Sequence, residues 1–286
     1  VVEKAIRKRL LSLKPPAIEH EYWLLDQDIN WRGVKVDMEL VDAALACNDE
    51  IVEEATESSK ILTGLENPNG TMQLKEWLTA RLGYDLETMR KDDVSNLLTQ
   101  DIPSDVRKVL QNRQVLGNSS IKKYLAMKNA VCSDGRIHGM LQFYGAMRSG
   151  RWAGRVVQLQ NLPRNYLEDL DTAREVLKSR DVEMLDLLYG NPGDVIKQLI
   201  RTALVAEEGH RFIVADFSAI EARVIAWLAH EKWRQDVFAQ GGDIYCASAS
   251  SMFHVPVEKH GVNGHLRQKG KVAELALGYG GGVGAM

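Results

Sequence analysis

The sequence predicts an α+β fold in which helices form most of the structure and short strands form a small sheet. Hydrophobic residues make up 45% and charged residues 26% of the 286 residues, which are ordinary values for a globular chain. Apolar residues recur at helical spacing over several long segments, and short apolar or alternating runs lie between those segments. This length allows one large domain or two smaller ones.

The elements predicted before residue 130 are mainly helical. Asp37 is expected to cap a helix whose apolar residues, beginning with Leu40 and Val41, follow helical spacing. A short extended piece, Val34 to Val36, should precede that helix, and the stretch 66–70 should form a turn after it. The predicted helices in this part span 20–31, 37 to the turn, 71–82, 92–99 and 104–129, the last with a break near Gly117.

The elements predicted after residue 130 include two strands. Residues 136–143 alternate enough for a strand, and a loop rich in glycine and arginine follows at 145–154. The apolar run at 211–217 predicts a buried strand. The predicted helices here lie within 165–203, where 190–193 forms a turn, and at 218–229, 232–239, 244–253 and 264–278.

The net charge of -3 hides a strong separation of charge along the chain. Residues 37–66 hold nine acids and one lysine, a net charge of -8, whereas residues 106–164 hold eleven bases and one acid, a net charge of +10. A block that basic within a foldable sequence is typical of a polyanion-binding surface. A solvated basic face is the alternative.

Several classes of protein are disfavoured. No apolar run approaches the roughly 20 residues of a membrane span, and the basic stretch 1–14 lacks the apolar core of a signal peptide. The three cysteines, Cys47, Cys132 and Cys246, are scattered without zinc or disulfide spacing. We therefore expect a cytoplasmic protein with reduced cysteines and no membrane partner.

The stretch from Val214 to Val224 is the most informative. Asp216 follows the predicted buried strand directly and precedes a helix, a place that holds a carboxylate rigidly and suits a magnesium ligand. Ser218 and Glu221 also have the spacing of a capping box, so Glu221 has a purely structural alternative as a helix cap.

A second pattern lies near the end of the chain. Arg267, Lys271, Leu275 and Tyr279 are spaced by four, which on a helix forms one stripe. Cations at a helix N-terminus oppose the helix dipole and favour an anionic partner such as a triphosphate. An ordinary surface helix with a basic first turn is the alternative.

A third pattern is rich in arginine and glycine. Glycines permit close backbone approach, and the arginines match phosphate or groove acceptors. The amides of Gln160 and Asn161 can donate to bases or sugars. The arginines of this stretch are Arg148, Arg151 and Arg155.

Together these stretches resemble the family A DNA polymerases. Gly150-Arg151 with Leu159-Gln-Asn-Leu-Pro163 is similar to the family's primer-template stretch, and Asp216-Phe-Ser-Ala-Ile-Glu-Ala-Arg223 is similar to its motif A. Asp243-Ile-Tyr245 resembles the D-I-H of the fingers, and Arg267 to Gly280 resembles motif B. The resemblance implies a right-hand architecture of helical thumb, β-sheet palm and helical fingers. Within the family, the sequence is more similar to the phage or prophage type.

The resemblance also implies a division of the chain and its missing part. Residues 1–36 would lead into the palm, 37–129 would form the thumb, 130–229 the palm with motif A at 214–224, and 230–286 part of the fingers with motif B at 267–280. Motif C, with the second metal carboxylate, normally lies well beyond motif B. We therefore expect a fragment that is incomplete at its C-terminus, with a missing C-terminal polymerase segment as one candidate partner.

Roles for individual residues are implied in the same way. Asp216, with the Phe217 carbonyl, would bind two magnesium (Mg2+) ions, and Arg267 and Lys271 would hold the triphosphate of a deoxynucleotide during catalysis. Glu221 would act as a steric gate against a 2'-hydroxyl. Leu275, Tyr279 and Tyr245 would complete the nucleotide site, Leu275 where the family has an aromatic ring and Tyr245 where it has histidine. The expected contacts to primer-template DNA are Arg148, Arg151, Arg155, Gln160, Asn161, Lys122 and Lys123.

The function expected is template-directed DNA synthesis by a nucleotidyltransferase. The alternative is a non-catalytic remnant that grips primer-template DNA. Glu221 argues against the related single-subunit RNA polymerases, and Asp37-Met-Glu39 imitates a nuclease D-x-E only at a helix start in an acidic block. An unpaired palm edge should also make the isolated chain poorly soluble or self-associating.

Overall fold

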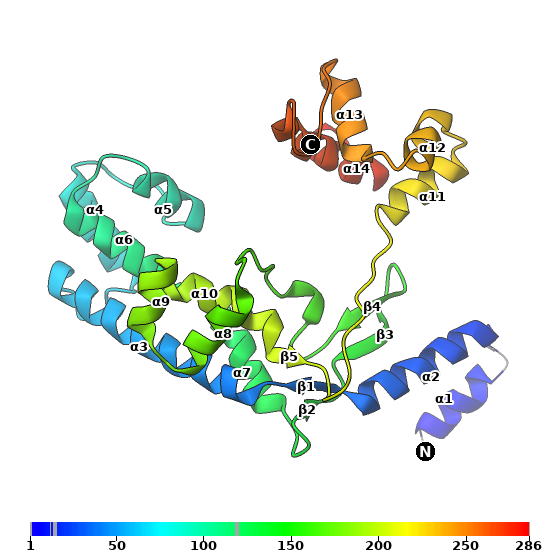
Figure 1. Cartoon of the computed structure of the whole chain (residues 1–286), viewed down its shortest axis with the longest axis horizontal. Helices are drawn as coiled ribbons and strands as arrows, with labels where there is room; N and C mark the ends of the chain where they lie inside the picture. The colour runs from blue at the N-terminus through cyan, green and yellow to red at the C-terminus, as the bar shows by residue number, and fades with distance from the viewer. Residues whose placement is uncertain (1, 12, 14–15, 118–119, 286) are drawn as a thin grey trace. The chain divides into compact units, whose positions relative to one another are not determined.

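The computed structural model describes residues 2–11, 13, 16–117 and 120–285, without the side chains of residues 91 and 285. The chain divides into two compact units, one ending at Arg211 and one beginning at Phe212 (Figure 1). No described helix combines the length and the apolar character that a membrane crossing requires.

The first unit is mainly helical, as the sequence predicts. Asp37 caps the long helix α3, because its Oδ1 accepts a hydrogen bond from the Leu40 amide at 3.1 Å. The predicted break near Gly117 separates α6 from α7. The helices of this unit are α1 (Val2–Leu10), α2 (Ala17–Arg32), α3 (Met38–Thr63), α4 (Thr71–Leu82), α5 (Lys91–Leu98), α6 (Ser104–Leu116), α7 (Ile121–Ala130), α8 (Leu170–Lys178), α9 (Val182–Tyr189) and α10 (Pro192–Leu199).

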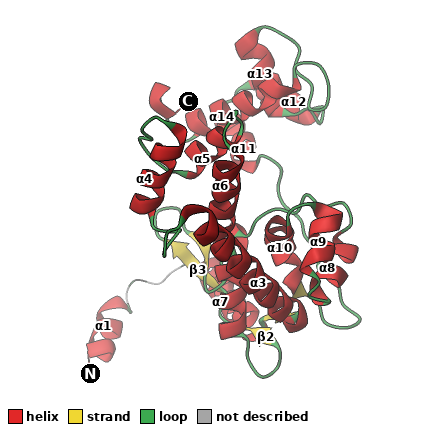
Figure 2. Cartoon of the chain, turned by 90° about the vertical axis from the view of Figure 1, so that its left-hand side faces the viewer, coloured by secondary structure: helices red, strands yellow, loops and turns green. Residues whose placement is uncertain are grey.

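Two apolar clusters hold the helices from α3 to α10 together. Helix α3 packs against α6, α7, α8 and α10, so it is shared by most of the unit (Figure 2). The larger cluster includes Leu40, Ile137 and Leu199, and the smaller one joins α4, α5 and α6 around Leu74 and Leu110. Burial of these side chains supplies the main stabilisation of the unit.

The strands of the first unit form two small sheets. Strands β1 (Val34–Val36), β2 (Arg136–Ile137) and β5 (Leu204–Val205) form an antiparallel sheet of order β2-β1-β5. Strands β3 (Leu141–Ala146) and β4 (Arg151–Gly154) form a separate antiparallel hairpin.

The hairpin corrects two sequence predictions. The single strand expected at 136–143 is two strands in different sheets, divided at Gly139, whose φ of +67° suits a turn. The loop expected at 145–154 contains β4. Gly145 permits this pairing, because a Cβ there would lie 2.4 Å from the Ala153 Cβ.

Helix α2 covers one edge of the hairpin. Asp26 and Asn30 lie one turn apart on the same face of the helix. Asp26 accepts the Phe143 amide at 2.7 Å, and Asn30 both accepts from the Leu141 amide and donates to its carbonyl. These bonds satisfy the outer backbone groups of β3 and fix the hairpin against α2.

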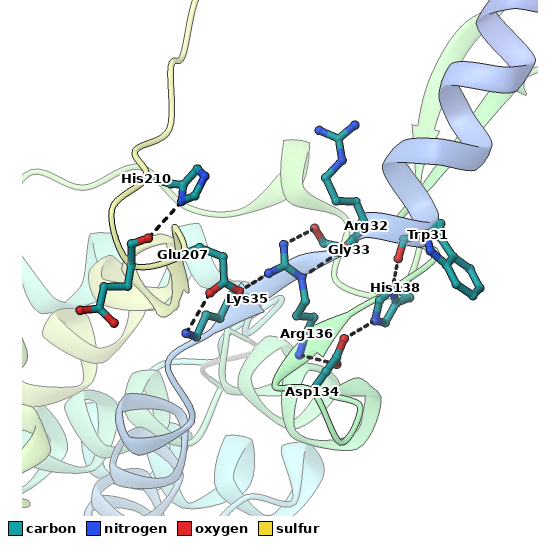
Figure 3. A network of polar contacts seen from close by, with 10 residues as sticks. Trp31, Arg32, Gly33, Lys35, Asp134, Arg136, His138, Glu207 and His210 are labelled. Atoms are coloured by element: carbon teal, nitrogen blue, oxygen red, sulfur yellow. Dashed lines mark hydrogen bonds and ion pairs between the residues drawn. The ribbon is translucent and has the colours of Figure 1, made fainter.

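A polar network ties the three-stranded sheet to its surroundings (Figure 3). Glu207 accepts from Arg136 and from Lys35, and Arg136 Nε donates to the Arg32 carbonyl at 2.8 Å. His138 lies between the Trp31 carbonyl and Asp134. The hydrogen bond to Asp134 raises the pKa of His138 above its ordinary value.

The second unit contains four described α-helices, α11 (Ile220–Leu228), α12 (Lys232–Ala239), α13 (Ile244–Phe253) and α14 (Arg267–Gly278), and two short 3-10 helices, η3 (Gly264–Leu266) and η4 (Val283–Ala285). The segment 211–217 is not the buried strand that its apolar residues predict. No described strand pairs with it, and Ile213 and Val214 are 84% and 91% exposed. An apolar run becomes a buried strand only where a neighbouring strand and a packed face cover it.

The capping box predicted at the start of α11 is also absent. The helix begins at Ile220, two residues later than predicted, and Ala219 occupies the cap position with a positive φ of 49° and no side-chain cap bond. The hydrogen bonds described at this helix start do not include the capping box predicted for Ser218 and Glu221.

Candidate nucleotide and nucleic-acid sites

A pocket of about 400 Å3 lies among the helices of the second unit. Its walls come from the segment before α11, from α11 itself, and from α12, α13 and α14. The pocket brings together six of the residues singled out in the sequence: Asp216, Phe217, Glu221, Tyr245, Leu275 and Tyr279.

Asp216 and Glu221, the two carboxylates of the stretch from Val214 to Val224, occupy different positions at this pocket. Asp216 lies in the extended segment before α11, exposed and not held by a sheet, which differs from the rigid strand end expected. Glu221 lies in the first turn of α11 and accepts a hydrogen bond from the Tyr279 hydroxyl. This bond links α11 to the C-terminal end of α14 across the pocket.

The stripe of α14 is only partly inside the pocket. Leu275 and Tyr279 line the cavity, and Lys271 and Arg267 lie one and two turns earlier on the same helix without lining it. Arg267 Nε donates to Asp243 Oδ2 at 2.8 Å, and its guanidinium lies 5.2 Å from the centre of the Tyr245 ring. The cations predicted for the triphosphate therefore lie beside the cavity.

Asp243 carries a charge that its surroundings stabilise. Partial burial by itself raises the pKa of this carboxyl, but the hydrogen bond from Arg267 and those from two backbone amides outweigh burial. The pKa of Asp243 is therefore lowered below its ordinary value. The same hydrogen bond, with Asp243 as acceptor, raises the pKa of the Arg267 guanidinium.

The sequence did not predict an ion pair in the wall of the pocket, between Arg234 and Glu274. Glu274 is buried on α14, where it accepts from Arg234 of α12 and from the Ser248 hydroxyl of α13. The three partners are far apart in sequence, so no local spacing reveals the pair. One signal in the sequence could have indicated the burial of Glu274. Glu274 lies four residues after Gly270, on the helix face that also carries the small residue Ala273.

Helices α13 and α14 cross closely at Gly270. A Cβ at this position would lie 2.1 Å from the Tyr245 carbonyl oxygen and 3.0 Å from the Ala249 Cβ. Glycine therefore permits the approach that sets Tyr245 and Leu275 around the same cavity.

The candidate nucleic-acid surface lies in the first unit, on the β3–β4 hairpin. Arg148 is in the turn between the strands, Arg151 begins β4 and Arg155 follows it, and all three are exposed. Gly150 adopts φ of +67°, and a Cβ there would lie 2.9 Å from the Tyr144 ring. The turn thus requires glycine at the position that precedes Arg151.

Of the remaining predicted DNA contacts, some already make hydrogen bonds or packing contacts within the protein. Lys123 Nζ donates to the Val157 carbonyl at 2.9 Å, and Asn161 donates to the Gln158 side chain at 3.3 Å. Gln160 packs its amide against the buried Gly154, where a Cβ would lie 2.1 Å from its oxygen. Lys122 is exposed on α7.

The donor chemistry of the pocket fits a hard divalent cation. Magnesium binds through one or two carboxylates and keeps further positions for water and substrate phosphate. The Asp216 carboxylate and the Phe217 carbonyl are oxygen donors of that kind beside the cavity. Among the described residues, no group of three or more His, Cys, Asp or Glu side chains forms a preassembled metal cluster.

Comparison with known proteins first defines the class of fold. The POL domain of Pol1 from M. smegmatis, solved in complex with DNA primer-template and dNTP, matches 87% of this chain with a TM-score of 0.58. Identity is 24%, and the match covers 40% of that chain. The likeness shows that the chain has the fold of part of a DNA polymerase domain, mostly helical with small sheets.

Sequence comparison then gives the family. The pattern of DNA polymerase family A matches residues 39–286. A DNA polymerase of Bacillus phage SP02 is 53% identical over 285 residues, which is 100% of this chain and 44% of the relative. DNA polymerase I of Rhizobium leguminosarum is 42% identical over 81 residues, which is 28% of this chain and 8% of the relative.

The chain belongs to DNA polymerase family A. The resemblance read from the three motifs is thereby confirmed. The chain spans less than half the length of the phage relative.

Proposed function

We propose that this chain is the part of a template-directed DNA polymerase that holds the primer-template and the incoming deoxynucleotide for transfer to a primer 3'-hydroxyl. The observation that carries the proposal is the pocket of the second unit, where residues separated by more than fifty positions, Asp216 and Tyr279, line one cavity. Membership of the family supports the reaction class.

Each residue of the pocket has a proposed role. Asp216 and the Phe217 carbonyl would hold magnesium, which in a two-metal site stabilises both the attacking and the leaving oxygen. Glu221, braced by Tyr279, would crowd a 2'-hydroxyl and so select deoxynucleotides. Leu275 would offer apolar contact to the sugar and base, in place of a flat ring.

Cationic side chains would bind the phosphates of the nucleotide and the DNA. Lys271 and Arg267 would hold the triphosphate, since they continue the stripe of Leu275 and Tyr279 towards the N-terminus of α14. Arg148, Arg151 and Arg155 would contact the primer-template, because the hairpin exposes all three. Lys122, Lys123, Gln160 and Asn161 complete the proposed DNA surface. The site of action would be the cytoplasm of a bacterial or phage-infected cell.

A second candidate is a primer-template binding module without chemistry of its own. The exposed apolar segment 211–217 favours it, because a palm strand would need a partner strand that the described residues do not supply. A further polymerase segment, carrying the second metal carboxylate and the covering strand, would then be the partner of this chain.

Primer extension separates the two candidates. The chain is incubated with a labelled primer-template, magnesium and all four deoxynucleotides, beside Asp216→Ala, and DNA binding is followed in a salt series. Extension by wild type and not by Asp216→Ala supports catalysis. Salt-sensitive binding by both without extension supports the binding module. Absence of binding at low salt contradicts both.

A further inference from the structure

Arg267 is held from two directions by residues of α13. Its Nε donates to Asp243 Oδ2 at 2.8 Å, and its guanidinium lies over the ring of Tyr245 at 5.2 Å from the centroid. The side chains of Arg267 and Asp243 are each 26% exposed, so solvent screens this ion pair only in part. The first residue of α14 is therefore attached to the start of α13.

The carboxylate that holds Arg267 is itself fixed by the backbone. Asp243 is the cap residue of α13, and its Oδ1 accepts from the amides of Tyr245 at 2.9 Å and Cys246 at 3.2 Å. One oxygen thus caps the helix while the other receives the arginine. A carboxylate anchored this way sets the direction of the guanidinium as well as its position.

The bond to Asp243 engages Nε of the guanidinium, and the Cys246 side chain also interacts with Arg267. Arginine donates through Nε and through two amino groups, and the two amino groups match two phosphate oxygens. Binding normally includes a cost for immobilising a flexible side chain, and that cost falls when the side chain is already held. Asp243 also neutralises much of the Arg267 charge, which leaves Lys271 as the main source of attraction over distance.

We propose that Asp243 and Tyr245 are positioning residues that hold Arg267 ready for the triphosphate of the incoming nucleotide. Tyr245 acts through the face of its ring beneath the guanidinium, and its hydroxyl makes no direct phosphate contact. This revises the nucleotide-binding role expected for Tyr245 from the sequence. The inference rests on the proposed function of Arg267 as a phosphate contact.

The test is a double-substitution cycle read by nucleotide binding. Isothermal titration measures the affinity of the full chain for dATP with magnesium, for wild type, Asp243→Asn, Arg267→Ala and the double variant. Asparagine caps helices about as well as aspartate, so α13 keeps its cap while the ion pair is lost. We expect Asp243→Asn to weaken binding about two- to tenfold, the cost of ordering one free arginine.

Controls separate positioning from general damage. Asp236→Asn removes an aspartate from an exposed ion pair with Lys232 in the same unit and should leave the affinity unchanged. Tyr245→Phe keeps the ring and should bind like wild type, whereas Tyr245→Leu should bind as weakly as Asp243→Asn. Circular dichroism on heating should give similar midpoints for wild type and Asp243→Asn.

The cycle distinguishes failure of this inference from failure of the proposed function. Asp243→Asn should weaken binding in the presence of Arg267 and have no further effect in the Arg267→Ala background. Equal effects in both backgrounds, or tighter binding by Asp243→Asn, overturn the positioning role. If Arg267→Ala binds dATP with wild-type affinity, Arg267 is not a phosphate contact, and the positioning role fails together with that contact.

Discussion

Asp37 joins α3 to α8 through one carboxylate. It caps α3 through the Leu40 amide, and its Oδ2 accepts from Arg174 at 2.6 Å and from Lys178 at 3.0 Å. Lys178 also pairs with Glu39 at 3.0 Å. The D-x-E spacing of Asp37 and Glu39 thus serves helix capping and attachment of α8, which accounts for these carboxylates without a nuclease.

The pairing of Asp37 predicts a specific dependence of stability on pH. Burial by itself raises the pKa of this carboxyl, but the Leu40 amide and the two cations outweigh it, so its pKa lies below the ordinary value of 3.8. A folded-state pKa below the unfolded one gives stability that is complete above the unfolded pKa and lost as pH falls through the folded pKa. The free energy of unfolding of wild type, measured with urea, should therefore fall on acidification from about pH 5 to about pH 3.

The matched variant is Asp37→Asn, which keeps the cap and loses the charge. Its unfolding free energy should be lower than that of wild type at neutral pH and should fall less steeply over the same acid range. Parallel profiles for the two proteins would show that Asp37 contributes no pH-dependent stability.

At the scale of elements, the second unit depends on the contact between α13 and α14. Gly270 allows the two backbones to approach, and Glu274, one turn later, receives Ser248 from α13 and Arg234 from α12. The pocket residues Tyr245 and Leu275 lie on these same two helices. The geometry of the proposed nucleotide site is therefore set by helix packing.

A pair of glycine-to-alanine substitutions on α14 tests this dependence. Gly270→Ala places a methyl group against the Tyr245 carbonyl and should destabilise the second unit by about 1–3 kcal/mol. Gly278→Ala meets nothing closer than Ile225 Cδ1 at 3.7 Å and should be neutral or stabilising by up to about 1 kcal/mol. Urea unfolding with hydrogen exchange of α13 and α14 measures both, and equal stability of the variants would refute close packing at Gly270.

The sequence predicts the helices well because their signals are local. Helical spacing, the Asp37 cap and the breaks at glycine place most helix boundaries within a few residues. The strands are predicted less well because pairing is not local: 136–143 divides between two sheets, and 211–217 has no described partner. The Arg234–Glu274 pair was missed for the same reason, since forty positions separate its members.

At the scale of the whole molecule, the chain divides into two compact units, each held by its own internal contacts. Residues 206–219 contain no described helix or strand, and the division between the units falls at Arg211 and Phe212. The stretch that resembles polymerase motif A lies at the start of the second unit, and the basic hairpin lies in the first. The fourfold division into lead-in segment, palm, thumb and fingers, and the expected self-association, stay predictions.

Limited proteolysis tests this division directly. Arg211 is exposed in an extended segment, so brief trypsin treatment should cleave there before it cleaves within the helices. Mass spectrometry should find products ending at Arg211 and beginning at Phe212. An Arg211→Gln variant should lose that early cleavage, and first cleavage within α3 or α13 would contradict the division into units.

Template-directed nucleotide selection by the proposed site can be tested by one binding measurement that requires no chemical step. A dideoxy-terminated primer is annealed to a template, and dissociation of the labelled duplex from the chain is timed with magnesium and each deoxynucleotide in turn. We expect the nucleotide complementary to the next template base to slow dissociation, and a change of this base to change which nucleotide does so. Equal rates with all four nucleotides would contradict it.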